Sequence, residues 1–234
     1  MKAAIIAAGE GSRLSASHPG QIKPMIRIAA KPLIHWVVVG LRSAGCKDIV
    51  VLTNSRGGKV APYLAAAFPD VNFDFVTADT ASSFESFRLV SLRLAETEEE
   101  FVVSTVDALI SPEDVARFIT ECRTANAAAG LALTLHVDDE KPLWADTDAK
   151  GRVTALGADA KDKNAVTCGL YYMTRSAATA IPNAERHSRL RDYLQQLVAS
   201  GAAVVGITLS KSLDVDRPED LEAAESFLTT ETKR

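Results

Sequence analysis

Short apolar runs alternate with helix-like amphipathic patterns along almost the whole chain. Six runs stand out, at residues 3–8, 49–53, 71–76, 101–106, 131–137 and 204–208. Continuous apolar runs of this length, separated by helices, are typical of strands that are buried on both faces of a parallel-rich sheet. We therefore predict an α/β fold with a mixed, mostly parallel central sheet that is flanked by helices.

The segments between these runs carry their own signals. Residues 32–44 place apolar side chains on one helical stripe, and the pattern stops at Gly45, a common residue after a helix end. Ser111 and Pro112 are followed by two acidic residues, a combination that favours the start of a helix. Residues 144–156, "WADTDAKGRVTAL", contain a polar turn between two short extended pieces. This pattern predicts a small β-hairpin inserted in the α/β core.

Size and charge narrow the classes of protein to consider. The 234 residues are compatible with one domain, residues 1–234, and the net charge of −4 provides no dense basic stripe for nucleic acid. No apolar stretch reaches the roughly 18 residues of a membrane span, and the N-terminus lacks the pattern of a secretory signal. Three widely spaced cysteines form no C-x-x-C pair: Cys46, Cys122 and Cys168. We expect free thiols and a cytoplasmic location, with no nucleic-acid or membrane partner.

The loop "AAGEGSRL", residues 7–14, follows the first apolar run directly. Glycines at positions 9 and 11 let a backbone approach a ligand closely, and Arg13 offers a planar fork of donors that suits phosphate oxygens. A second cation, Lys23, follows on the same connection. Both cations lie near the carboxyl end of the first predicted strand, where open α/β sheets bind ligands. The loop is therefore predicted to hold the phosphates of a nucleotide.

Three carboxylates follow predicted strands or extended segments. Asp107 comes after the run 101–106, and Asp214 and Asp216 lie just before a helix that is predicted to begin near Pro218. Residues of the same parity on an extended segment face the same side. Mg²⁺ prefers oxygen ligands, and two protein carboxylates are enough to hold it beside a phosphate. Two structural alternatives stay open: Asp107 as the cap of the next turn, and Asp216 as the N-cap of the last helix.

Several of these segments together resemble one known family. "AAGEGSRL" followed by "KPMIRIAAKPLI" is similar to the signature of the sugar-phosphate nucleotidyltransferases, a pyrophosphorylase family with a Rossmann-like GT-A core, which includes MobA-like NTP transferases. "LDVDRPEDLEAA" near the end, "FVVSTVDALIS" and "TCGLYYM" resemble further segments of that family. The resemblance spans nearly the whole chain, and its two ends are the most specific parts.

The resemblance implies transfer of a nucleoside monophosphate from an NTP to a phosphorylated sugar or small alcohol, with release of pyrophosphate. It implies Mg²⁺ held by Asp107 and Asp216, with Asp214 as the alternative second ligand. It makes Arg13 and Lys23 the catalytic cations, Lys23 on the α-phosphate or the attacking phosphate and Arg13 on the departing pyrophosphate. The nucleotide contacts that it implies are Ala7, Ala8, Gly9, Glu10, Gly11, Ser12, Arg13, Lys23, Asp79 and Thr80.

The chain also departs from the family pattern. Asp79 and Val106 stand where the family usually has glycine, and no E-K-P occurs in the acceptor region, where Lys161 and Lys163 are the candidates for phosphate contacts. The serine-rich segment after Thr80 also resembles phosphocholine cytidylyltransferases. Cytidylyl transfer to a non-sugar phosphate, molybdopterin nucleotidylation and a nucleotide-binding regulatory module without turnover are the alternatives. The expected partners are an NTP and a phosphorylated small-molecule acceptor, and a homo-oligomer is left open.

Overall fold

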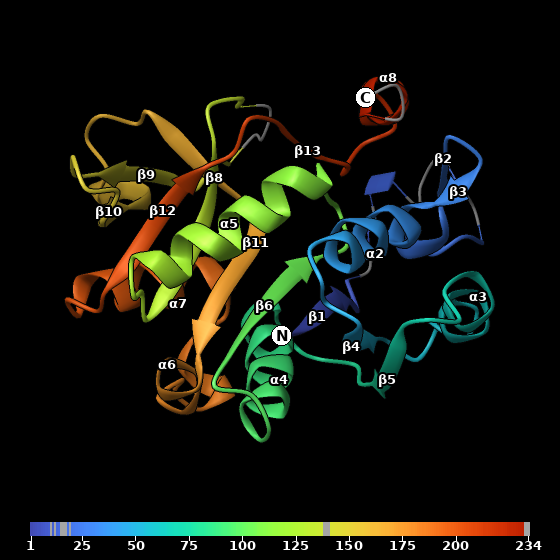
Figure 1. The fold of residues 1–234 in the computed structure, drawn as a ribbon, viewed down its shortest axis with the longest axis horizontal. Coiled ribbons are helices and arrows are strands. Elements are labelled where there is room, and N and C mark those ends of the chain that lie inside the picture. The colour runs from blue at the N-terminus through green and yellow to red at the C-terminus, as the bar shows by residue number, and fades with distance from the viewer. Residues whose placement is uncertain (10, 12, 15–17, 19, 138–140, 232–234) are drawn as a thin grey trace.

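The structure is a computed structural model that describes residues 1–9, 11, 13–14, 18, 20–137 and 141–231. The first half of the chain contributes four parallel strands to a central sheet (Figure 1). They are β1 (Lys2–Ala7), β4 (Asp48–Thr53), β5 (Asn72–Thr77) and β6 (Glu100–Thr105). β1 lies between β4 and β6, and Ala4 is paired with Val50 on one side and Val103 on the other.

The second half of the sheet contains the antiparallel pairs. β11 (Ala165–Thr174) runs antiparallel to β6 and to β8 (Ala129–Thr134), and β12 (Val204–Thr208) then pairs parallel with β8. The predicted mixed sheet is therefore confirmed. The sequence predicts one strand over 131–137, but β8 ends at Thr134. The apolar side chains beyond it are exposed, Leu135 at 67% and Val137 at 39%.

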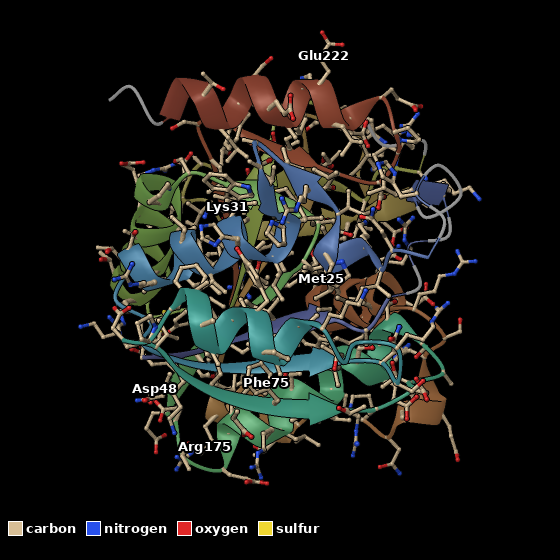
Figure 2. The ribbon with its side chains drawn as sticks, turned by 90° about the vertical axis from the view of Figure 1, so that its right-hand side faces the viewer. Met25, Lys31, Asp48, Phe75, Arg175 and Glu222 are labelled. Carbon is tan, nitrogen blue, oxygen red and sulfur yellow. The ribbon has the colours of Figure 1, made fainter. Side chains whose placement is uncertain are left out.

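β5 differs from the other predicted strands because it lies at the edge of the sheet. The apolar run 71–76 predicts a strand buried on both faces, but most residues of β5 are exposed or half-buried. Phe75 lies on this edge in Figure 2, and its ring stacks on that of Phe73 with 5.5 Å between the ring centroids. The two rings cover each other, so part of the apolar surface of this edge strand is removed from water.

The predicted β-hairpin is confirmed as β9 (Trp144–Thr147) and β10 (Val153–Leu156), which pair antiparallel. Asp148 fixes the turn because its carboxylate accepts hydrogen bonds from the backbone N–H groups of Lys150 and Arg152 at 2.8 and 2.9 Å. Gly151 in the same turn has a φ of +77°, a left-handed conformation that favours glycine. β9 also pairs with the start of β11, so the hairpin extends the main sheet.

Helices cover both faces of the sheet (Figure 1). One apolar core contains side chains of α2 (Leu33–Ser43), α3 (Val60–Ala67) and α5 (Pro112–Thr124). The core on the other face contains side chains of α4 (Ser83–Ala95), α6 (Arg175–Thr179) and α7 (Leu190–Ala199). Ser111 caps α5 as predicted, since its hydroxyl accepts from the backbone N–H of Asp114 at 3.2 Å. The predicted Rossmann-like arrangement is thus confirmed.

A third, smaller core joins the last helix to the early loops. α8 (Asp220–Glu231) packs there with β2 (Arg27–Ile28), which pairs with β3 (Lys31–Pro32), and with residues of β7 (Ala108–Ile110) and β13 (Ser212–Asp214). The described residues also contain three short 3-10 turns: η1 (Lys23–Met25), η2 (Gly157–Asp159) and η3 (Ala184–Arg186). The three cysteines are free and buried. Among the described helices, none has the length and hydrophobicity of a transmembrane span.

Candidate active site

The glycine loop, the two cations and two carboxylates meet in one pocket at the carboxyl ends of β1 and β6. We call it the Lys23 pocket, and define it by six of its lining residues: Gly9, Gly11, Arg13, Lys23, Asp107 and Asp216. These residues come from three parts of the chain that are far apart in sequence: the connection after β1, the residue after β6 and the segment after β13. The carboxyl edge of a parallel sheet is where such segments converge, as the sequence predicts.

A short two-stranded ribbon brings the two carboxylates together. β7 follows Asp107 directly, β13 precedes Asp216, and the strands pair antiparallel with Ala108 opposite Asp214. The backbone N–H of Val215 then donates to the carbonyl oxygen of Asp107 at 3.1 Å. Val215 is completely buried, whereas Asp214 and Asp216 both line a neighbouring cavity. The expectation that these two aspartates face the same side is therefore confirmed.

Lys23 lies between the two carboxylates. Its ammonium donates to Asp107 Oδ2 at 2.7 Å and also to Asp216 Oδ1, although only 5% of Lys23 is exposed. Burial lowers the pKa of Lys23, but the charges of Asp107 and Asp216 outweigh burial and raise this pKa above its ordinary value. For Asp107, burial acts in the opposite direction and raises the pKa. The charge and the hydrogen bond of the Lys23 ammonium outweigh burial, so the pKa of Asp107 is lowered. Both shifts favour the charged forms of Lys23 and Asp107, and the contacts of Lys23 with Asp107 and Asp216 form a compact ionic triad in the pocket.

Asp216 also forms an ion pair with Arg13, whose Nη2 lies 3.4 Å from Asp216 Oδ2. The carboxylate of Asp216 therefore binds two cations rather than capping α8. The turn before α8 is instead held by Asp220, which accepts from the backbone N–H groups of Asp216 and Arg217 at 2.8 and 2.7 Å. The N-cap alternative for Asp216 is wrong for this reason. Asp107 contacts Lys23 and is likewise more than the cap of a turn.

The two glycines of the loop have different structural roles. Gly11 has a φ of +57°, and a Cβ placed on it would lie 2.6 Å from the Cβ of Lys23. Glycine at this position therefore allows the loop to pack directly against the Lys23 side chain. A Cβ on Gly9 would meet no heavy atom within 4 Å in the described part of the chain. Gly9 has an ordinary φ, and its missing side chain leaves open space in the pocket.

This difference gives a sharp test of the loop. We expect Gly9→Ala to weaken NTP binding about tenfold without destabilising the fold, because the added methyl group enters space that a phosphate would occupy. Gly58→Ala is the matched control, since its Cβ also meets nothing within 4 Å in the described structure and Gly58 is not among the residues lining the pocket. Nucleotide titration and thermal unfolding of both variants are the measurements. Unchanged NTP affinity in Gly9→Ala would mean that the glycine belongs to an ordinary turn.

The remaining predicted nucleotide contacts lie close to the same sheet edge. Ala7 is buried at the end of β1, and the carbonyl oxygen of Ala8 accepts from the Asn54 side chain at 2.9 Å. Asp79 accepts from the backbone N–H of Ser55 at 2.9 Å, and the hydroxyl of Thr80 lies 2.6 Å from that of Ser86. Asp79 and Thr80 are not among the residues lining the Lys23 pocket. Glu10 and Ser12 lie outside the described residues.

Asn54 and Ser83 are two residues of this region that the sequence patterns do not predict. Asn54 connects the loop after β4 to the loop after β1 through its bond to Ala8. Ser83 begins α4 and lines the Lys23 pocket, and its hydroxyl accepts from the backbone N–H of Leu190 at 3.0 Å. The only signal in the sequence is the serine-rich stretch after Thr80, which does not indicate which serine turns toward the site.

Two carboxylates that share one cation are a donor set that suits Mg²⁺. Asp107 and Asp216 come from different segments and direct oxygens to the same point, now held by the Lys23 ammonium. Mg²⁺ commonly uses one or two carboxylates together with phosphate oxygens and water. The described part of the chain contains no group of three or more His, Cys, Asp or Glu side chains that could hold a metal ion. Asp214 therefore does not join Asp107 and Asp216 in one such group.

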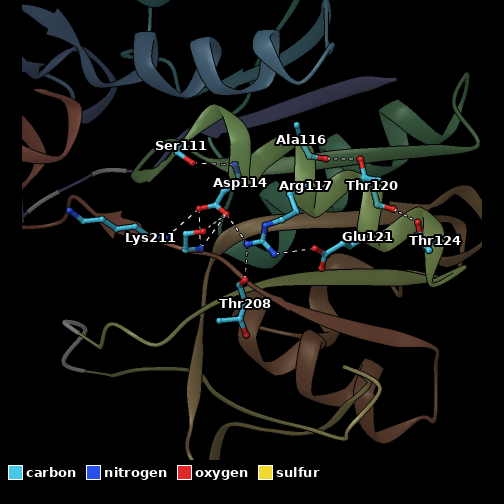
Figure 3. A network of polar contacts seen from close by, with 10 residues as sticks. Ser111, Asp114, Ala116, Arg117, Thr120, Glu121, Thr124, Thr208 and Lys211 are labelled. Carbon is cyan, nitrogen blue, oxygen red and sulfur yellow. Dashed lines mark hydrogen bonds and ion pairs between the residues drawn. The ribbon is translucent and has the colours of Figure 1, made fainter. Parts of the chain in front are cut away.

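A network centred on the buried carboxylate of Asp114 anchors the segment that contains Asp214 and Asp216 (Figure 3). Asp114 of α5 accepts from Arg117 Nη2 at 2.7 Å and from the backbone N–H groups of Ser210 and Lys211 at 3.0 and 3.3 Å. Arg117 also donates to the carbonyl oxygen of Thr208 at 2.9 Å. The loop from β12 to β13 is thus tied to α5. In the sequence, Asp114 is visible only as an acidic residue in a first helical turn.

We expect Asp114→Asn to lower the free energy of unfolding by about 2 kcal/mol at pH 7, because Arg117 and the backbone N–H groups of Ser210 and Lys211 lose a charged acceptor. Burial raises the pKa of Asp114, but the bonds from Arg117, Ser210 and Lys211 lower it overall. This stabilisation is fully present above the unfolded pKa near 3.9 and is lost as the pH falls through the lower folded pKa. The difference between wild type and variant should therefore shrink below about pH 4.

Urea unfolding at neutral and acidic pH measures both effects. Glu113→Gln is the matched control, because Glu113 lies in the same turn of α5 and is exposed. An equal loss of stability in the control, or a difference that does not depend on pH, would contradict the role given to Asp114.

Comparison with known proteins agrees with this geometry. The profile of the family described as "MobA-like NTP transferase domain" matches residues 3–200. The bifunctional protein GlmU of Sorangium cellulosum is 26% identical over 97% of the chain, which spans 52% of that protein. The low-salt glycan biosynthesis nucleotidyltransferase Agl11 of Haloferax volcanii is 24% identical over 97% of the chain, which spans 66% of it. The chain thus spans about half to two thirds of the length of these relatives.

A solved structure shows the same fold over the whole length. The inositol-1-phosphate CTP transferase from T. maritima superposes with a TM-score of 0.82 and 20% sequence identity, and the alignment covers 100% of this chain and 96% of that one. The matching profile covers most of the chain, from the glycine loop through β11 and α7. The protein belongs to the family of MobA-like NTP transferase domains.

Proposed function

We propose that this protein is a Mg²⁺-dependent nucleotidyltransferase that transfers a nucleoside monophosphate from an NTP to a phosphorylated sugar or small alcohol. The observation that carries the proposal is the convergence of Gly9, Gly11, Arg13, Lys23, Asp107 and Asp216 on one pocket. Family membership and the nucleotidyltransferase relatives support it. A binding module without turnover would need the glycine loop, but it would not need the ionic triad beside it.

The reaction joins two anions, so the enzyme must mainly position them and neutralise charge. A phosphate oxygen of the acceptor attacks the α-phosphorus of the NTP in line. The new P–O bond forms as the bond to the β-phosphate oxygen breaks, and both electrons of that bond leave with pyrophosphate. Lys23 neutralises charge at the α-phosphate or the attacking phosphate, and Arg13 neutralises the departing pyrophosphate. No covalent enzyme intermediate is needed.

Asp107 and Asp216 would hold Mg²⁺, with Asp214 as the alternative second ligand. The ion, when bound, supplies positive charge to the phosphate oxygens and helps to orient them. The protein residues have separate tasks: the open space at Gly9 admits the phosphates, and Gly11 lets the loop pack on Lys23.

The wider assignment includes the organisation and partners of the chain. We propose that residues 1–234 act as a single nucleotidyltransferase domain, supported by α8, which packs in the same small core as β2 and β13. The partners are an NTP and a phosphorylated small-molecule acceptor. A reducing compartment, the cytoplasm, fits the three free, buried thiols.

A matrix of NTPs against phosphorylated acceptors tests the function, with pyrophosphate release as the readout. We expect one combination to release pyrophosphate in the presence of Mg²⁺, and we expect excess EDTA to stop the release. The Lys23→Met variant, which removes the ammonium of the triad, is the negative control. NTP binding without pyrophosphate release from any combination would favour the regulatory module instead.

A further inference from the structure

The charges that line the Lys23 pocket balance one another. Its described lining includes four charged side chains, the cations Arg13 and Lys23 and the carboxylates Asp107 and Asp216. Lys23 contacts both carboxylates, and Arg13 contacts Asp216. The two carboxylates proposed to hold Mg²⁺ are therefore neutralised by cations of the same pocket. This pair offers little net negative charge to a divalent cation.

The Lys23 ammonium lies at the point where a metal ion shared by the two carboxylates would bind. It donates to Asp107 Oδ2 at 2.7 Å and also to Asp216 Oδ1, so oxygens of both carboxylates converge on one positive charge. An ammonium and a divalent cation repel each other and cannot share this point. The Lys23 side chain and the metal ion therefore compete for the same carboxylate oxygens.

The surroundings of Lys23 hold its side chain in this position. The side chain is buried, and a Cβ placed on Gly11 would lie 2.6, 3.2 and 3.1 Å from its Cβ, Cγ and Cδ atoms, so the glycine loop covers the stem. Pro24 follows at the start of η1 and restricts the backbone there. A buried ammonium that loses its carboxylates without gaining another anion is strongly unfavourable. Lys23 is therefore expected to leave the carboxylates only for a new anionic partner.

The phosphates of an NTP are the anionic partner that the glycine loop would provide. The open space at Gly9 lies in the same pocket, on the loop that packs against Lys23. A triphosphate carries several negative charges and accepts hydrogen bonds from ammonium and guanidinium groups. Binding of a triphosphate there would attract both cations and leave Asp107 and Asp216 without their counter-charges. The carboxylates would then bind a divalent cation more tightly when the nucleotide is in place.

We propose that Lys23 is an internal counter-ion, which keeps divalent cations away from Asp107 and Asp216 until nucleotide phosphates draw its ammonium away. This inference rests on the proposed function, because it concerns how the same site acquires its metal ion. Arg13 has a smaller part, since it contacts only Asp216 and its side chain is 55% exposed. In the absence of nucleotide, the protein therefore binds Mg²⁺ weakly even though both carboxylates line the pocket.

Manganese binding in the absence of nucleotide tests the proposal without relying on turnover. Mn²⁺, which like Mg²⁺ prefers oxygen ligands, is titrated into the protein, and the free ion is measured by electron paramagnetic resonance. We expect Lys23→Met to bind Mn²⁺ at least about tenfold more tightly than wild type, because both carboxylates lose the shared counter-charge. Lys31→Met is the matched control and should bind as wild type does, since Lys31 is exposed on β3 and is not among the residues lining the pocket. Equal affinity in wild type and Lys23→Met would overturn the proposal.

Thermal unfolding shows whether Lys23→Met is folded and gives a second readout. Without divalent cations, this variant should have a lower Tm than wild type, because Asp107 and Asp216 then repel each other. Millimolar Mg²⁺ should raise the Tm of Lys23→Met by several degrees and leave that of wild type within about one degree. An equal rise in both proteins would show that the ammonium does not exclude the ion.

Arg13→Ala keeps the test decisive if Lys23→Met does not fold. The exposed position of Arg13 should let the fold tolerate this change. We expect Arg13→Ala to bind Mn²⁺ about two- to fivefold more tightly than wild type, because Asp216 loses one of its two cations. An affinity equal to that of wild type would contradict the charge balance on which the proposal depends.

The effect of the nucleotide is measured with α,β-methylene NTP analogues, which cannot release pyrophosphate. The nitrogen-15 signal of the Lys23 ammonium, assigned by its loss in Lys23→Met, is followed by NMR in the presence of EDTA. We expect this signal to shift when a bound analogue saturates the protein, and to stay unchanged with the nucleoside alone. An unchanged signal at saturation would show that the ammonium remains on its carboxylates, and would overturn the proposal.

These measurements separate failure of this inference from failure of the proposed function. If no combination of NTP and acceptor releases pyrophosphate, the nucleotidyltransferase assignment fails, while Mn²⁺ titration still decides whether Lys23 excludes divalent cations. If pyrophosphate is released but Lys23→Met binds Mn²⁺ no more tightly than wild type, the enzyme assignment stands and the counter-ion role of Lys23 is wrong.

Discussion

Asp107→Ala and Asp216→Ala are each expected to lower kcat by on the order of a thousandfold or more, while the protein stays folded. Each substitution removes one carboxylate of the pair proposed to hold Mg²⁺. Each variant also leaves Lys23 with one remaining carboxylate, so the buried ammonium is not left unpaired. Pyrophosphate release at several Mg²⁺ concentrations, together with thermal unfolding, measures the effect.

Asp214→Ala is the comparison that decides the second ligand. Asp214 lies on the same extended segment and is exposed, so its loss should not disturb the fold. If Asp214→Ala is as damaging as Asp107→Ala and Asp216→Ala is mild, the pair is Asp107 and Asp214. Near-native kcat in both Asp107→Ala and Asp216→Ala would remove the metal assignment altogether.

Arg13→Ala is expected to lower kcat about a hundredfold, equivalent to about 3 kcal/mol of transition-state stabilisation, and to weaken NTP binding much less. The charge of Arg13 matters most as the bond to the leaving pyrophosphate breaks. Arg13→Lys should recover only part of the rate, because an ammonium cannot form the bidentate fork of a guanidinium. The side chain of Arg13 is 55% exposed, so the fold should tolerate both changes.

Steady-state kinetics and NTP titration measure this separation of kcat from affinity. Arg27→Ala is the control, because Arg27 is an exposed arginine of β2 that is not among the residues lining the Lys23 pocket. Normal turnover of Arg13→Ala would show that Arg13 forms an ion pair with Asp216 but does not take part in catalysis. In that case, no residue in the described part of the loop would neutralise the departing pyrophosphate.

The central strands can be predicted from the sequence because their burial is visible in a few adjacent residues. β1, β4 and β6 are covered on both faces, so each is a continuous apolar run. The glycine loop and Asp107 follow two of these strands directly, so their meeting at one edge of the sheet is also predictable. β5 is predictable as a strand, but its position at the edge is not, because apolar character alone does not give the order of strands.

The rest of the site depends on contacts between distant segments. β7 and β13 are three residues each, too short to show a period, and the strands β8 to β12 lie between Ala108 and Asp214 in the chain. Ser83 has the sequence pattern of an ordinary helix start, so no local pattern predicts its place in the lining of the Lys23 pocket.

The pairing of β12 with β8 has a practical consequence for trimming this protein. The match to the family profile ends at residue 200, and a shortened chain that stops there would lack β12, β13 and α8. The N–H and C=O groups of β8 that pair with β12 would then lie on an open sheet edge, and the apolar side chains now covered by Phe227 and Val215 would contact water. Open edges of this kind template association between chains. A trimmed protein should therefore aggregate, so its inactivity would carry no information about Asp216, and point substitutions in the 234-residue chain are the sound test.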